Sequence, residues 1–195
     1  MSINSDVIQA LFWSITYLLF IIYSLKNKTH GISLVSIVLN FSWETNALSL
    51  DIVNRHASWI HLLWFSLDLI IIYLALKYLK DKKKTIYTFL MFFICFTVLN
   101  FVFKVTGGML ISCFIIDLIM AIDFHIFFKK TSLKVDFTYI IAAISKLVGD
   151  LFAWLYYESF SPIIFIIGII VAYINIVYVF IVLESYKKDK VISST

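Results

Sequence analysis

Residues 31–48 read GISLVSIVLNFSWETNAL, and this stretch decides what kind of fold the chain can have. It is apolar enough to form most of a membrane-spanning helix, which needs about 20 residues. It nevertheless carries Asn40 and, four residues later, Glu44 well inside the run. An unpaired charge in hydrocarbon is costly. We therefore expect Glu44 to be paired, or protonated and used chemically, or both.

The composition of the whole chain is that of an integral membrane protein. Hydrophobic residues make up 62% of its 195 residues, charged residues make up 14%, and the mean hydropathy is +0.98. Soluble domains contain about 45–50% apolar residues. The net charge of +4 does not point to a nucleic-acid partner, because the charges lie in short breaks between apolar runs. We predict a single all-α transmembrane domain over residues 1–195, with the lipid bilayer as its partner.

Seven apolar runs are long enough to span the membrane. Short polar breaks such as KNKTH (residues 26–30) and KDKKKT (residues 80–85) separate them. The predicted spans cover residues 7–25, 31–52, 58–79, 85–104, 108–128, 137–157 and 162–185. The sequence therefore predicts seven transmembrane helices.

The basic residues of the breaks predict the orientation, because cytoplasmic loops carry an excess of Lys and Arg. With seven alternating spans, one side of the membrane receives only Arg55 and Lys104. The other side receives Lys26, Lys28, Lys80, Lys82, Lys83, Lys84, Lys129, Lys130, Lys134, Lys187, Lys188 and Lys190. We therefore predict a multi-pass protein of the cell membrane, with its N-terminus outside and its C-terminus in the cytoplasm.

Four carboxylates fall inside four different predicted spans at a similar depth. They are Glu44, Asp68, Asp117 and Asp150. At a rise of about 1.5 Å per residue, they lie roughly 10–15 Å from the outer ends of their spans. Lys146 precedes Asp150 by four residues, so the two share a helix face and Lys146 is expected to neutralise Asp150.

One lysine cannot compensate four buried acids, so we expect at least one acid to stay protonated. A neutral carboxylic acid in an apolar cavity can act as a Brønsted acid. For each acid taken alone, a hydrogen bond between helices is the alternative role. Asn40 is expected to form such a bond.

Aromatic residues are abundant and several of them accompany the acids. Phe, Tyr and Trp make up 18% of the chain. Trp43 adjoins Glu44, Trp64 lies one turn before an acid, and Trp154 lies one turn after another. Aromatic faces stabilise cations without acting as nucleophiles or bases, which suits carbocation chemistry. Packing between helices is the alternative role of these side chains.

Residues 15–48, ITYLLFIIYSLKNKTHGISLVSIVLNFSWETNAL, resemble the first two spans of the small integral-membrane terpene cyclases. This family is known from fungal meroterpenoid and indole-diterpene pathways, including the paspaline and pyripyropene types, and has bacterial relatives. Its motif is an Asn, a two-residue gap, then Trp-Glu, which matches Asn40, Trp43 and Glu44. Weaker similarity follows at LDLIIIYLALK (67–77), SKLVG (145–149) and NIVY (175–178). The resemblance implies seven spans and a catalytic role for Glu44.

The chain departs from the fungal pattern at the second catalytic acid. The fungal members carry an Asp in the last span, in an Asp-x-x-Tyr setting, and the matching residue here is Asn175, before Tyr178. An amide can orient a substrate or hold a water molecule, but it cannot donate a proton as an acid. Asp68 or Asp150 would then supply the second carboxylate, or the protein runs a different reaction.

The leading hypothesis is a membrane-embedded terpene cyclase that protonates an alkene or epoxide of a polyprenyl or prenylated substrate. We expect no metal and no cofactor, because neither DDxxD nor DxDD occurs in the chain. The predicted catalytic residues are Glu44, Asp68 and Asp150. The predicted substrate-binding residues are Asn40, Trp43, Trp64, Lys146, Trp154, Asn175 and Tyr178.

Two other function classes remain open from the sequence. A small-solute or proton-coupled transporter could use buried acids and a lysine, but alternating access commonly uses broken helices. Only Gly149 and Gly168 lie inside the predicted spans away from their ends, so the helices are expected to be continuous. A non-catalytic membrane subunit or receptor is the third class, and it predicts that no cavity joins the acids.

Overall fold

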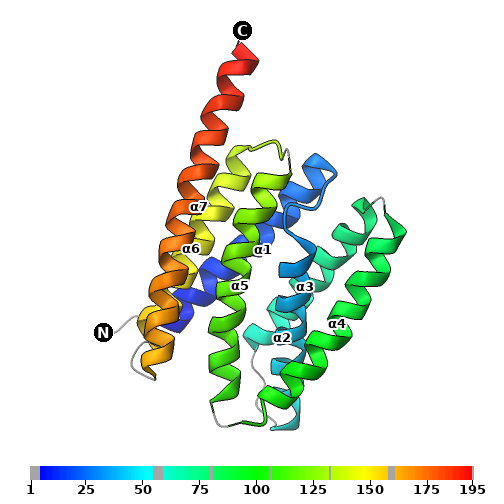
Figure 1. Ribbon diagram of the computed structural model, residues 1–195, viewed down its shortest axis with the longest axis vertical. Coiled ribbons are helices and arrows are strands. Elements are labelled where there is room, and N and C mark those ends of the chain that lie inside the picture. The colour runs from blue at the N-terminus through cyan, green and yellow to red at the C-terminus, as the bar shows by residue number, and fades with distance from the viewer. Residues whose placement is uncertain are drawn as a thin grey trace.

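The computed structural model describes the backbone of residues 5–54, 59–79, 81–105, 107–131, 133–157 and 161–194, and the side chains of these ranges apart from 5, 6, 82 and 189–194. Within these ranges every regular element is an α-helix (Figure 1). The helices are α1 (Ser5–Asn27), α2 (Leu34–Val53), α3 (Trp59–Tyr78), α4 (Lys82–Val102), α5 (Gly108–Lys130), α6 (Phe137–Tyr157) and α7 (Pro162–Ser194). The predicted all-α fold is confirmed.

Six of the seven described helices, α1 and α3 to α7, are long and apolar enough to cross a membrane. Helix α2 is not among them, although its 20 residues equal the length of α3. Polar side chains, which include Asn40, Glu44 and Asp51, reduce its mean hydropathy. Length and composition therefore support six of the seven spans that the sequence predicts.

Several helix boundaries differ by a few residues from those expected, and the differences at α2 and α7 have a clear cause. The sequence predicts a span from residue 31, but α2 begins at Leu34 because Ser33 caps it and its Oγ accepts a hydrogen bond from the backbone N–H of Val35. Helix α7 continues past the expected end at residue 185, because the Lys-rich segment that follows consists largely of residues compatible with a helix. This part of α7 projects beyond the other helices in Figure 1.

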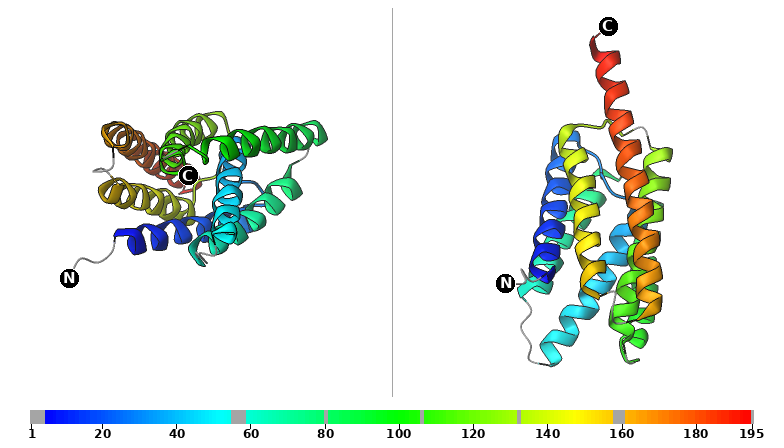
Figure 2. Two further views of the ribbon diagram at one scale, coloured as in Figure 1. Left: turned by 90° about the horizontal axis from the view of Figure 1, so that it is seen from below. Right: turned by 90° about the vertical axis from the view of Figure 1, so that its left-hand side faces the viewer.

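Six of the described helices close into a ring, and α4 lies outside it. Helix α1 packs against α6 and α3, α2 packs against α3 and α5, and α7 packs against α5 and α6. Helix α4 contacts α2 and α5 from the outside, and Figure 2 shows it at the rim of the bundle. The interior of the ring is therefore reached by side chains of α1, α2, α3, α5, α6 and α7.

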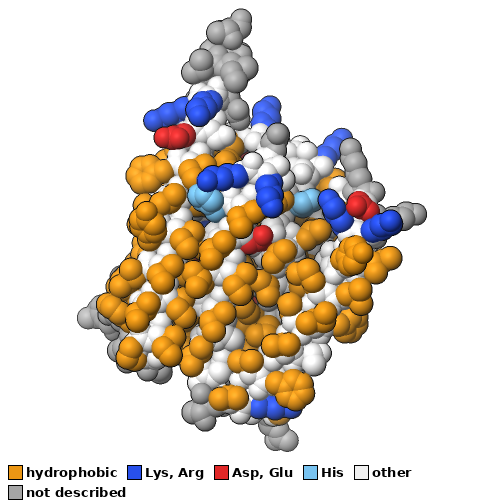
Figure 3. Space-filling view, in the orientation of Figure 1, with side chains coloured by type: hydrophobic (Ala, Val, Ile, Leu, Met, Phe, Trp, Pro, Cys, Tyr) orange, Lys and Arg blue, Asp and Glu red, His pale blue; other side chains and the backbone are white. Residues whose placement is uncertain are grey.

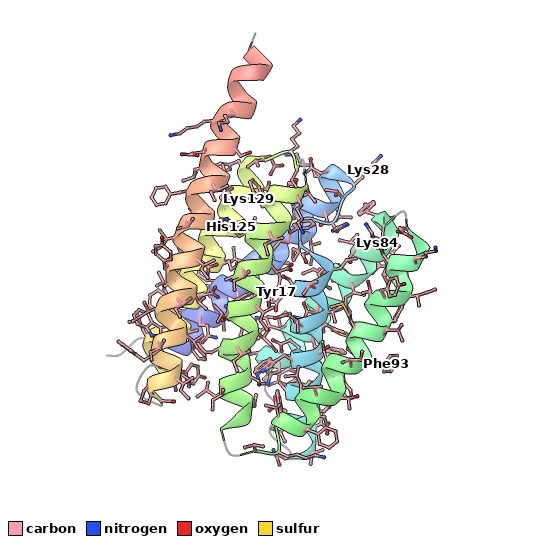
Figure 4. The ribbon with its side chains drawn as sticks, in the orientation of Figure 1. Tyr17, Lys28, Lys84, Phe93, His125 and Lys129 are labelled. Carbon is pink, nitrogen blue, oxygen red and sulfur yellow. The ribbon has the colours of Figure 1, made fainter. Side chains whose placement is uncertain are left out.

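The outer surface carries a broad band of large apolar side chains, visible on the face drawn in Figure 3. Helix α4 contributes many of them, and Phe93 points away from the bundle in Figure 4. Its exposed apolar residues are Ile86, Tyr87, Phe89, Leu90, Phe93, Ile94, Val98 and Phe101. A soluble monomer rarely exposes so much contiguous apolar surface. The band is that of a multi-pass membrane protein whose surface contacts lipid.

Lysines gather at one end of the bundle. Lys28, Lys84 and Lys129 all lie there in Figure 4. At this end Lys26 of α1 forms an ion pair of 2.8 Å with Asp136, which precedes α6. Partial burial raises the pKa of Asp136, but hydrogen bonds from Lys26 and from the backbone N–H of Tyr139 outweigh this effect and hold the pKa below its ordinary value. Arg55 and Lys80, and the side chains of Lys82 and Lys190, lie outside the described residues.

Gly168 of α7 provides the space in which Trp154 of α6 packs. A Cβ atom at residue 168 would lie far inside the contact distance of Trp154 Cδ1 and Cγ, and 2.6 Å from its Nε1. We expect Gly168→Ala to lower the free energy of unfolding by about 1–3 kcal/mol, because overpacking forces the indole out of its position. The measurement is thermal unfolding of the purified protein in detergent.

The control for this prediction removes the indole. In a Trp154→Ala background, Gly168→Ala should be neutral or stabilising, because Ala favours a helix interior by about 1 kcal/mol over Gly. Equal melting temperatures for wild-type protein and the single Gly168→Ala variant would show that α6 and α7 are not packed this closely.

Candidate functional site

A cavity of about 630 Å³ opens at the end of the bundle opposite the lysines. It lies between α1, α2, α3 and α5, and the connection from α4 to α5 closes one side of it. Helix α1 contributes Trp13 and Tyr17, α2 contributes Trp43 and Glu44, and α5 contributes Asp117. The volume is within the range of about 300–1,000 Å³ that small-molecule sites occupy.

Glu44 is buried in the wall of this cavity, with 2% of its surface exposed. Its Oε2 atom has no hydrogen-bond partner among the described residues. The charges that act on Glu44 are those of two other carboxylates, Asp68 and Asp51. Burial without a cationic partner disfavours the anionic form of a carboxyl group.

Asn40 joins three helices beside Glu44. The two residues are one turn apart on α2, so they lie on the same face. The Asn40 Nδ2 atom donates to Asp68 Oδ2 of α3 at 2.8 Å and also donates to the Tyr17 hydroxyl of α1. The expected interhelical role of Asn40 is confirmed. Tyr17 lies at mid-height of the bundle in Figure 4.

Asp68 lies beside the cavity rather than on its surface. It lines a separate hollow of about 20 Å³, whose walls Trp13, Tyr17 and Asn40 share with the large cavity. Such a volume holds about one water molecule. Tyr17 is linked to Asp68 through Asn40, and it lines the large cavity together with Glu44 and Asp117.

Tryptophan side chains form much of the cavity wall. Trp43 Nε1 donates to Ser112 Oγ of α5 at 3.3 Å, and Trp64 Nε1 donates to Ser14 Oγ of α1 at 3.1 Å. These bonds fix both indoles between helices while their rings line the cavity. His61 also lines it and pairs with Asp51 at 2.7 Å, with its ring centroid 5.8 Å from that of Trp43.

A second polar cluster is buried behind Trp13. Lys146 Nζ lies 2.6 Å from Asp150 Oδ2, and Asn175 Nδ2 of α7 donates to the same oxygen at 2.6 Å. The expected pairing of Lys146 with Asp150 is confirmed. Lys146 Nζ also lies 5.2 Å from the centroid of a Trp13 ring and 5.6 Å from that of Phe124. None of the three members of this cluster is among the residues that line either cavity described above.

Trp154 and Tyr178, both predicted to bind substrate, also lie outside the lining of these cavities. Trp154 packs against Phe165, with ring centroids 5.9 Å apart. Tyr178 is 1% exposed, and its hydroxyl lies 2.8 Å from that of Tyr139 in the aromatic core between α5, α6 and α7. The structure therefore separates the predicted site into two groups. Asn40, Trp43, Glu44 and Trp64 line the large cavity, and Asp68 adjoins it, whereas Lys146, Asp150, Trp154, Asn175 and Tyr178 pack elsewhere.

Tyr17, His61 and Asp117 line the cavity but are absent from the site residues that the sequence predicts. Asp117 is visible in the sequence as an acid at the right depth, but α5 is apolar on all sides, so its sequence does not indicate which face turns inward. Among the described residues, no three His, Cys, Asp or Glu side chains are grouped closely enough to hold a metal ion.

Comparison with known proteins identifies the family of the chain. The family model for Pyr4-like transmembrane terpene cyclases matches residues 4–148, from α1 into α6. The terpene cyclase pyr4 of Aspergillus fumigatus is 32% identical over 75 residues, which are 38% of this chain and 31% of the fungal enzyme. The match thus spans about a third of that relative's length. No solved structure matches the chain significantly. Because the family model covers well over half of its length, the chain belongs to the family of Pyr4-like transmembrane terpene cyclases.

Proposed function

We propose that the protein cyclises a neutral, prenylated substrate and that Glu44 starts the reaction by donating a proton. The observation that carries this proposal is the position of Glu44, a buried carboxyl group with one unpartnered oxygen in the wall of an aromatic cavity of about 630 Å³. The proposal uses no metal and no cofactor. Family membership supports cyclase activity over the transporter alternative.

The first step transfers the proton of the Glu44 carboxyl group to the substrate. With an epoxide, the proton bonds to the epoxide oxygen and a C–O bond breaks, leaving a hydroxyl group. The π electrons of the next double bond form the new C–C bond, and the positive charge moves to the far carbon of that double bond. With a terminal alkene, the proton bonds to carbon instead. Trp43, Trp64 and Tyr17 stabilise the cation through their ring faces.

The substrate reaches the cavity from the lipid, because its prenyl chain is soluble there. We propose that all seven helices cross the cell membrane, with the N-terminus outside and the lysine-rich end in the cytoplasm. The cavity then opens on the outer side. A continuous α2 of 20 residues is about 30 Å long, which equals the hydrocarbon thickness despite its polar residues.

The test uses the purified protein in lipid nanodiscs and a panel of probes. The panel consists of geranyl, farnesyl and geranylgeranyl phenyl ethers, each with and without a terminal epoxide. We expect an isomer of at least one probe with the same mass. Each ring formed from an alkene probe removes one double bond, whereas the first ring formed from an epoxide probe replaces the epoxide ring and leaves the number of double bonds unchanged. In D₂O the cyclised product of an alkene probe should gain one deuterium on carbon, because the initiating proton exchanges with solvent.

Two outcomes would contradict the proposal. One is the recovery of every probe unchanged. The other is cyclisation without deuterium from solvent on the alkene probes, which would mean that the reaction starts without a protein acid. Uptake of a solute into proteoliposomes that depends on a pH gradient would favour the transporter alternative instead.

A further inference from the structure

The proposed cyclisation needs a base as well as an acid. A reaction that begins with a donated proton and ends in an alkene must return a proton from carbon to the protein. The base has to reach the cation, so its carboxylate must line the cavity that holds the substrate. Asp68, Asp117 and Asp150 are the candidates, and the structure places them in three different settings.

Asp150 is paired and lies outside the cavity lining. Its Oδ2 atom accepts hydrogen bonds from Lys146 and Asn175, whereas its Oδ1 atom has no partner among the described residues, and Asp150 is only 4% exposed. It is not among the lining residues of the cavity, and Trp13 lies between the cavity and Lys146. A carboxylate so engaged serves to balance Lys146.

Asp68 is also separated from the substrate. It accepts a hydrogen bond from Asn40, is 2% exposed, and faces the hollow of about 20 Å³. A hollow that holds about one water molecule cannot admit the carbon atoms of a substrate.

Asp117 lines the cavity together with Glu44. It is only partly buried, and it lies one turn after Cys113, which lines the same cavity. Tyr17 lines this cavity as well, so both carboxyl groups border the same space as the Tyr17 hydroxyl. Helix α5 packs directly against α2, which carries Glu44.

The two acids differ in whether a cation acts on them. The charges that act on Glu44 belong to the carboxylates Asp68 and Asp51. The Asp150 carboxylate acts on Asp117, but the Lys146 ammonium acts on it as well and offsets part of this effect. A nearby cation favours the charged form of a carboxyl group, and nearby anions favour the neutral form. Asp117 is thus the cavity acid that has a cation to support its anion, and two carboxyl groups in different surroundings can divide the roles of acid and base.

We propose that Asp117 is the catalytic base that ends the reaction, an inference that rests on the proposed function. The Asp117 carboxylate takes a proton from the carbon next to the final cationic centre. The electron pair of that C–H bond becomes the new C=C bond, and Asp117 becomes the neutral acid. Glu44 has lost one proton and Asp117 has gained one, so the net reaction is an isomerisation. Exchange of one proton through water in the emptied cavity restores both groups.

The test compares Asp117→Asn with wild-type protein on the terminal epoxide of farnesyl phenyl ether, in nanodiscs. Asp117→Asn should still consume the probe, because Glu44 is intact. We expect the main alkene product to fall by about 10²-fold or more relative to wild type. Alcohols formed by addition of water to the cation, with the mass of the probe plus one water, should replace it. Asp117→Glu keeps a carboxylate in a shifted position and should change which alkene isomer forms.

Asp123→Asn is the matched control. Asp123 also lies on α5, but it accepts hydrogen bonds from the Oγ and backbone N–H of Ser36 and does not line the cavity. It should keep the wild-type product ratio. If Asp117→Asn does not fold, the isomer ratio of Asp117→Glu decides.

Three results would overturn the assignment. An unchanged alkene ratio in both Asp117 variants would exclude Asp117 as the base. The loss of alkene and gain of alcohol in Asp68→Asn or Asp150→Asn, but not in Asp117→Asn, would move the role to that residue. If the wild-type protein converts no probe of the panel, the proposed function and this assignment fail together. If it does convert a probe, the Asp117 variants test this assignment alone.

Discussion

Glu44→Gln is expected to lower the rate of cyclisation by about 10²–10⁴-fold, the range that a positioned acid contributes. Glutamine has nearly the same shape as glutamate, but its amide cannot donate a proton as an acid. The measurement is product formation from the terminal epoxide of farnesyl phenyl ether by protein in nanodiscs. The melting temperature in detergent should stay close to that of wild type, because the change removes an ionisable group that has no cation partner among the described residues.

Glu184→Gln provides the control for this substitution. It makes the same chemical change on α7, at an exposed residue on the lysine-rich side of the bundle. It should leave the rate unchanged. Cyclisation by Glu44→Gln at the wild-type rate would contradict the role of Glu44.

Lys146→Met is expected to destabilise the protein strongly. It leaves Asp150 as a buried acid without its cation, and breaking a buried ion pair in this way costs about 3–5 kcal/mol. Lys146 is 1% exposed and Asp150 is 4% exposed, so water cannot replace the lost partner. Thermal or denaturant unfolding in detergent measures the change.

Two further variants make this result specific. Lys146→Met combined with Asp150→Asn removes both charges and should recover most of the loss, because replacing both partners of a buried pair is often nearly neutral. Lys26→Met breaks the ion pair with Asp136. Because the Lys26 side chain is 61% exposed, this change should lower the free energy of unfolding by only about 0–1 kcal/mol. Equal effects of Lys146→Met and Lys26→Met would mean that Lys146 is solvated.

Much of the architecture follows from local sequence patterns. The apolar runs predict every described helix, since the length of a run needs no knowledge of its neighbours. The pairing of Lys146 with Asp150 is likewise local, because a spacing of four residues brings two side chains together on any helix. The proximity of Trp43 to Glu44 in the cavity wall follows from their adjacency and from the inward face of α2.

The division of the acids between cavity and core could not be predicted in this way. It depends on how each helix is rotated in the ring, and a helix that is apolar on all sides carries no periodic signal for that rotation. Helix α5 is such a helix, so its sequence does not show that Asp117 faces the cavity. Asn175 is a similar case. Its role in holding Asp150 depends on α7 packing against α6, which no local pattern reports.

The length of α7 has a practical consequence. Its 33 residues measure about 50 Å, whereas the hydrocarbon layer is about 30 Å thick. A span of this thickness that begins at Pro162 would leave about 20 Å of helix beyond the hydrocarbon, at the end of the bundle where the lysines gather. A fluorophore or affinity label attached there would lie at the opposite end of the bundle from the cavity. Protein immobilised through that extension would leave the cavity unobstructed for assays.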